Sequence, residues 1–91
     1  SIISFLKPGI IKVITGLEEQ NFYVEDGIVE FKDNLLSILT SSIFNVKDAD
    51  KKFVSDTLAE AEKELTKDNL NDQRRFLLNH KVDALRSLSI N

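Results

Sequence analysis

Apolar residues recur at helical spacing along much of the chain, and few turn-forming residues separate the stretches. One proline and three glycines interrupt 91 residues, and this scarcity favours helices. Pro8 suits the first turn of a helix, and apolar residues three and four apart follow it. The pattern predicts a helix over residues 8–20, preceded at residues 1–7 by either an extended arm or a helical turn.

Residues 22–31 depart from this pattern. Aromatic and β-branched residues stand on both sides of Asp26-Gly27, and such a pair between two β-prone runs is typical of a short hairpin. A simple loop between helices is the competing interpretation. The composition favours the hairpin, which would have to pack on the helices to be stable.

Three further helices are predicted after this stretch. The first covers residues 33–46, with Asp33 as its N-cap, and is apolar nearly all round, which predicts deep burial. Asp48 or Asp50 can cap the next, which runs to about residue 66, and Asn69 or Asn71 can cap the last, which runs to about residue 88. We therefore expect a mainly α fold, a compact four-helix bundle forming a single helical domain over residues 1–91, with a short β-hairpin at about residues 22–31 between the first two helices.

Composition narrows the classes of function. Hydrophobic residues make up 42% and charged residues 30%, which is normal for a globular domain. The net charge of −3 disfavours generic binding to nucleic acid. The chain has no cysteine, which mildly favours an intracellular, cytoplasmic location. It also lacks methionine, so either the initiator has been removed or the chain is a fragment. The small Ser1 fits a cleaved initiator and thus a short complete chain.

Nothing in the sequence indicates catalysis, a metal or a cofactor. His80 is the only histidine, and no nucleophile motif accompanies it. Asp48 and Asp50 begin like a calcium loop, but Phe53 stands where that loop needs glycine and Ala59 where it needs glutamate. The protein is therefore expected to be non-enzymatic and to bind no cofactor.

The leading hypothesis is a protein–protein interaction module, namely a small adaptor, assembly or regulatory protein that presents an amphipathic helix face. Its apolar residues exceed what one small helical core would use, which favours a homodimer as the commonest solution. Aromatic residues and arginine are enriched at interfaces. The candidate partner-binding residues on the last helix and the N-terminal arm are Phe76, Arg75, Asn79, His80, Ile2, Ile3, Phe5 and Leu6.

Two other functions compete with this one. A nucleic-acid-associated regulator would use the basic face of the last helix, and it predicts strong salt dependence of binding. Its residues would be Arg74, Arg75, Lys81 and Arg86.

The second alternative is binding to a membrane surface through the N-terminal amphipathic segment. The run Gly9-Ile10-Ile11-Lys12-Val13-Ile14, followed by Leu17 and Glu19-Gln20, resembles the short staphylococcal phenol-soluble modulin peptides. That resemblance covers about a dozen residues and implies a membrane-active helix. A helix that contributes to the core is the favoured interpretation of the same residues.

Overall fold

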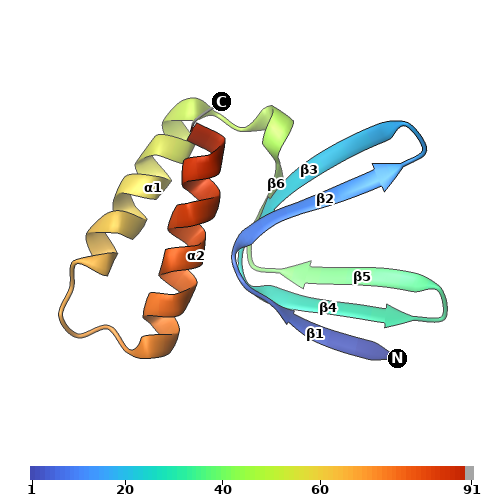
Figure 1. The fold of residues 1–91 in the computed structure, drawn as a ribbon, viewed down its shortest axis with the longest axis horizontal. Helices are drawn as coiled ribbons and strands as arrows, with labels where there is room; N and C mark the ends of the chain where they lie inside the picture. Colours follow the sequence, from blue (N-terminus) through green and yellow to red (C-terminus); the bar gives the residue numbers. More distant parts are fainter. Residues whose placement is uncertain (90–91) are drawn as a thin grey trace.

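The computed structural model describes residues 1–89, and its first half is β-structure (Figure 1). Six strands come first and two helices follow, so the predicted mainly α four-helix bundle is wrong. A single 3-10 turn, Val46–Asp48, connects the strands to the helices. The elements are β1 (Ile2–Leu6), β2 (Gly9–Thr15), β3 (Glu18–Val24), β4 (Gly27–Lys32), β5 (Leu35–Thr40), β6 (Ile43–Asn45), α1 (Lys51–Leu65) and α2 (Asp72–Ser89).

The strands form two three-stranded antiparallel sheets, ordered β1-β4-β5 and β2-β3-β6. The chain crosses from one sheet to the other three times, between β1 and β2, between β3 and β4, and between β5 and β6. The sheets meet at these crossovers, and their strands diverge away from them (Figure 1). Residues 22–31 therefore contribute to two strands in different sheets, and the predicted hairpin between them is wrong.

The predicted helix over residues 8–20 is instead the hairpin of β2 and β3. Ile10, Ile11, Val13 and Ile14 satisfy a helical spacing, but β-branched side chains are stiff and fit a pleated strand better. The turn places Gly16 at a φ of 62°, a conformation that glycine adopts without steric cost. Spacing alone did not distinguish the two structures, because an apolar run this dense fits both periods.

The predicted helix over residues 33–46 is also wrong, because a turn and two strands occupy it. Asp33 and Asn34 have φ values of 51° and 63°, and these left-handed conformations form the two-residue turn typical of tight hairpins. Asp33 thus turns the chain from β4 into β5 rather than capping a helix. The N-terminal arm is β1, which pairs along β4 from Ile2↔Phe31 to Leu6↔Gly27.

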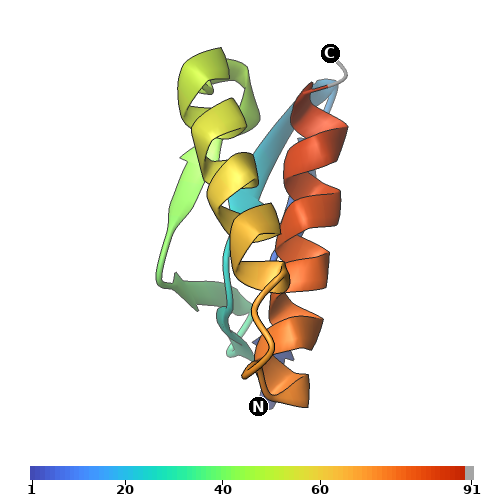
Figure 2. The ribbon, with the colours of Figure 1, turned by 90° about the vertical axis from the view of Figure 1, so that its left-hand side faces the viewer.

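The last two predicted helices are confirmed. The Asp50 side chain accepts a hydrogen bond from the backbone N–H of Lys52, and Asn71 accepts one from Arg74 at 2.7 Å, so both expected caps are present. The helices lie side by side and antiparallel in front of the strands (Figure 2). Ala61, Leu78 and Val82 are buried between them.

A second buried cluster joins the helices to one sheet. It contains Tyr23 from β3, Val54 from α1, and Ala84 and Leu85 from α2. Phe44 of β6 stacks on Tyr23 with ring centroids 4.9 Å apart. The helical pair therefore packs on one face of the β2-β3-β6 sheet, near the crossovers.

Candidate functional site

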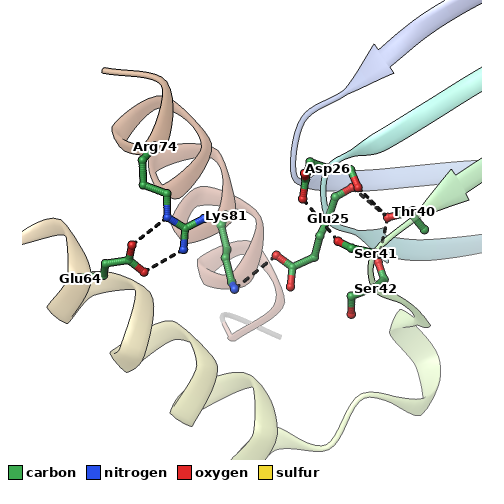
Figure 3. A network of polar contacts seen from close by, with 8 residues as sticks. All are labelled: Glu25, Asp26, Thr40, Ser41, Ser42, Glu64, Arg74 and Lys81. Atoms are coloured by element: carbon green, nitrogen blue, oxygen red, sulfur yellow. Dashed lines mark hydrogen bonds and ion pairs between the residues drawn. The ribbon is translucent and has the colours of Figure 1, made fainter. Parts of the chain in front are cut away.

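The crossovers between the sheets are joined by hydrogen bonds of backbone and hydroxyl groups (Figure 3). The backbone N–H of Glu25 donates to the carbonyl of Ser42 at 3.0 Å. The hydroxyl of Thr40 lies 3.1 Å from the carbonyl oxygen of Glu25, and the Ser41 hydroxyl lies 3.4 Å from a carboxylate oxygen of Asp26. These contacts fix the β3–β4 crossover against the β5–β6 crossover.

An ion pair connects this junction to α2. Lys81 Nζ lies 3.3 Å from a carboxylate oxygen of Glu25 (Figure 3), and the two side chains are 21% and 22% exposed. Because the pair is partly buried, dissolved salt screens its attraction less than it would screen a fully exposed pair. Glu25 therefore links the β3–β4 crossover to α2 through an ion pair.

The hydroxyl of Tyr23 is buried at the same junction. Burial raises the pKa of this hydroxyl far above its usual range, and the negative charge and acceptor oxygens of Glu25 raise it further. The contact with Glu25 falls short of a well-formed hydrogen bond, and the hydroxyl has no other partner among residues 1–89. The tyrosine therefore remains neutral, and its oxygen is desolvated without full compensation.

Removing that oxygen should cost the protein little. We expect Tyr23→Phe to change the free energy of unfolding by less than about 1 kcal/mol, in the stabilising direction, because the apolar ring stays and an uncompensated buried polar group is lost. Urea denaturation measures the difference. A loss of about 2 kcal/mol or more would mean that the hydroxyl makes a strong hydrogen bond in solution.

A bidentate ion pair holds the two helices together. The guanidinium of Arg74 donates to the carboxylate of Glu64 at 2.7 and 2.8 Å (Figure 3). These hydrogen bonds are the main cause of a lowered pKa for Glu64, and they raise the pKa of Arg74. The pair lies at the surface, so its contribution to stability is small at neutral pH.

The lowered pKa of Glu64 predicts a pH dependence. Because the folded-state pKa is depressed, the stabilisation is fully present above the ordinary value of 4.5 and is lost as the pH falls through the folded value. We expect Arg74→Gln to return the pKa of Glu64 toward 4.5. The free energy of unfolding of the variant should then change less with pH between the lowered folded-state pKa and 4.5. An NMR titration of the Glu64 carboxyl group measures both pKa values. An unchanged pKa in the variant would show that the ion pair does not form in solution.

The fold brings together two groups of candidate residues that are far apart in the sequence. Phe5 and Leu6 of β1 line an open cavity of about 980 Å³ together with Phe76 of α2. Phe5 is 83% exposed and Phe76 is 52% exposed. Ile2 and Ile3 lie further along β1, also exposed, and do not line this cavity.

The other three candidates on α2 have different roles. Arg75 is half-buried and donates to the carbonyl oxygens of Leu65 and Lys67 at 3.3 and 3.5 Å, so it fastens the connection between the helices. The ring of His80 packs edge-on against Phe76 with centroids 4.5 Å apart. Asn79 is exposed on the same helix. Of the four, Phe76 is the residue positioned to extend an apolar surface.

The basic residues of α2 do not form a free cationic face. Arg74 pairs with Glu64, Lys81 with Glu25, and Arg86 with Glu62 at 2.9 Å. A side chain engaged with a carboxylate on its own domain is a poor ligand for a phosphate. This arrangement gives a structural reason against the nucleic-acid alternative.

The membrane alternative loses its structural basis because residues 9–15 form a strand instead of an amphipathic helix. Within residues 1–89, neither helix combines the length and hydropathy that crossing a bilayer requires. The same residues contain no group of three or more histidine or acidic side chains arranged to hold a metal ion.

Comparisons with known proteins identify the class. The chain is 55% identical to the ATP synthase epsilon chain of Pelagibacter ubique (strain HTCC1062) over 89 residues, which are 98% of this chain and 68% of that protein. It therefore belongs to the ATP synthase epsilon chain family. A second epsilon chain, from Hydrogenovibrio crunogenus (strain DSM 25203 / XCL-2), is 28% identical over 61 residues, 67% of this chain and 42% of that protein. No family model matches the sequence.

A solved structure agrees with the fold. A chain in the mitochondrial ATP synthase of Euglena gracilis, in its OSCP/F1/c-ring assembly, superimposes with a TM-score of 0.63 and 18% identity, covering 98% of this chain and 56% of that chain. At this identity the likeness concerns the fold alone. The present chain thus spans about two thirds of the first relative and about half of this structure.

Family membership corrects several expectations. The epsilon chain is a non-catalytic subunit of an enzyme complex, which agrees with the prediction that this chain is not itself catalytic. The independent adaptor and the nucleic-acid regulator are wrong, as is the homodimer, because the family is one of subunits in a hetero-oligomer. The expectation that the protein lies inside the cell agrees with membership of this family.

Proposed function

We propose that this chain is an epsilon subunit of an ATP synthase, peripheral to the membrane on its cytoplasmic side, and that it acts by binding other subunits of the F1 part. The observation that carries the proposal is 55% identity to the Pelagibacter epsilon chain over 98% of the present chain.

The cavity lined by Phe5, Leu6 and Phe76 is the surface we propose for contact with a neighbouring subunit. It combines two strongly exposed aromatic rings with the aliphatic side chains of Ile10 and Ile28, which are both 39% exposed. Exposed apolar surface of this kind marks interaction sites, and aromatic residues are enriched at their centres. His80 would hold the Phe76 ring in place through their edge-on contact.

Replacement within a relative tests the subunit assignment. The 89 matched residues of the Pelagibacter epsilon chain would be exchanged for those of this chain, and the chimera co-expressed with the other F1 subunits of that organism. We expect the chimera to co-purify with F1 in the same stoichiometry as the native chain. Exclusion of a folded chimera from an F1 that accepts the native chain would contradict the assignment.

Variants of the same chimera test the contact surface. We expect Phe76→Ser to reduce retention on F1 by about tenfold, because loss of a well-packed interface aromatic costs more than about 1 kcal/mol. The control is Phe53→Ser on α1, an aromatic of similar exposure at 48% against 52% that lies outside the cavity. Circular dichroism confirms that both variants fold. Equal retention of both variants would rule out the Phe76 surface.

A further inference from the structure

The outer end of the β2–β3 hairpin, residues 12–20, projects from the protein on the side away from the helices (Figure 1). Strand β6 pairs with β3 only at residues 22–24, so the hairpin beyond that point is a ribbon of two strands. Each of residues 12–20 is exposed. A two-stranded ribbon is marginally stable in water, and contact with another molecule would stabilise it.

The turn at the tip of this hairpin exposes a leucine that the backbone does not require. Gly16 and Leu17 form the turn, and of the two only Gly16 has a positive φ. Such a turn needs glycine at its first position and accepts other residues at its second, where polar residues are usual. Leu17 is nonetheless fully exposed, and Ile14 on the strand leading into the turn is 66% exposed. Apolar side chains gathered on a protruding surface mark an interaction site.

The charge around this tip is acidic. Lys12 Nζ lies 3.7 Å from a carboxylate oxygen of Glu19, and the Asn21 amide donates to the same carboxylate at 3.2 Å. Glu18 forms no salt bridge within residues 1–89, so its charge is left unbalanced. A surface that receives Leu17 is therefore complementary if lysine or arginine borders it. The same negative charge disfavours contact with an anionic membrane.

We propose that the tip formed by Ile14, Leu17 and Glu18 is a second docking site, and that it inserts into an apolar pocket bordered by lysine or arginine on a neighbouring subunit. This inference rests on the proposed function as a subunit of an ATP synthase. The tip is separate from the cavity described above, because a strand rises about 3.3 Å per residue and the turn therefore lies about 20 Å from Ile10, which lines that cavity. The chain would thus be held to its neighbours at two distinct surfaces.

Photo-crosslinking from the tip identifies what covers it. The chimera with the Pelagibacter epsilon chain carries benzoylphenylalanine in place of Leu17 and is assembled into the membrane-bound enzyme of that organism. We expect irradiation to join it to one other subunit, at an apolar segment that contains lysine or arginine. A crosslink to lipid or to a second copy of the chain would overturn the proposal, as would a retained chimera that forms no crosslink. Exclusion of the unsubstituted chimera would overturn the subunit assignment as well.

The turns of two hairpins provide matched variants. Leu35 follows the β4–β5 turn and is 65% exposed, so Leu35→Ser controls for the loss of an exposed leucine beside a turn. We expect Leu17→Ser to speed dissociation of the chimera from the enzyme about tenfold, and Leu35→Ser to change it less than about twofold. Equal effects of the two variants would overturn the proposal.

Reversing the charge beside the leucine tests the basic border of the pocket. We expect Glu18→Lys to speed dissociation about tenfold at low salt, and by less than about threefold at about 0.5 M salt, because salt screens both the native attraction and the new repulsion. Dissociation rates measured over this range of salt provide the comparison. An effect of Glu18→Lys that is absent at low salt, or that does not change with salt, would overturn the proposal.

Discussion

Adding a single methyl group at Gly27 should severely destabilise the protein. A Cβ atom there would lie 2.1 Å from the carbonyl oxygen of Leu39 and 2.8 Å from the Cα of Thr40. Both are backbone atoms of the paired strand β5, so no side-chain rotation can relieve the clash. We expect Gly27→Ala to lower the free energy of unfolding by roughly 3 kcal/mol or more, at the upper end of overpacking effects, because the β4–β5 ladder must separate at the crossover.

The control for this prediction is Gly9→Ala, at the start of β2. Outside the adjacent residues, a Cβ at Gly9 would have its nearest neighbour, the carbonyl oxygen of Lys7, at 3.9 Å, which is an ordinary contact. This substitution should therefore change stability by less than about 1 kcal/mol. Urea denaturation of both variants provides the comparison. Similar stabilities for the two variants would show that β4 and β5 do not approach as closely in solution as in the structure.

The sequence was sufficient to predict the helical half of the fold, for local reasons. Asp50 and Asn71 cap their own helices, and the apolar stripe of α1 alternates cleanly with polar residues, so propensity, capping and periodicity agree. In the first half these signals conflict. Residues 10–14 fit a helical stripe and a strand equally well, and only their content of β-branched residues favours the strand.

The strand pairing could not be read from local patterns. Residues 22–31 look like one hairpin because Asp26-Gly27 separates two β-prone runs, yet β3 pairs with β2 and β4 pairs with β1. Gly27 is required because β5 approaches it closely. β5 lies too far along the chain for any local turn rule to take it into account. The surplus of apolar residues was a correct observation, but the homodimer inferred from it was wrong.

The candidate site was only partly predictable. Exposed apolar character identified Phe5 and Phe76 separately, whereas their placement around one cavity depends on packing of α2 beside the β1–β2 crossover. The junction of Tyr23, Glu25 and Lys81 was missed. Carboxylates and lysines are common on helix and turn surfaces, and nothing in the sequence distinguishes the pair that spans 56 positions along the chain.

Leu85 is a fully buried contact between the helical pair and the β2-β3-β6 sheet. Its side chain is 0% exposed and packs in the cluster that contains Tyr23. We expect Leu85→Ala to lower the free energy of unfolding by about 3 kcal/mol, because buried apolar atoms are removed and a cavity is left in their place. Because this cluster joins the helices to β3, we also expect faster amide hydrogen exchange in β3.

Leu78→Ala separates this effect from general loss of core. Leu78 is 1% exposed, but its cluster lies between α1 and α2 and contains no strand residue. The loss of stability should be similar in size, whereas the faster exchange should appear in the helices and spare β3. If both variants accelerated exchange in β3 equally, the helices and strands would open as one cooperative unit. The buried contacts of Leu85 and the ion pair of Lys81 with Glu25 would then not act as a separable connection between them.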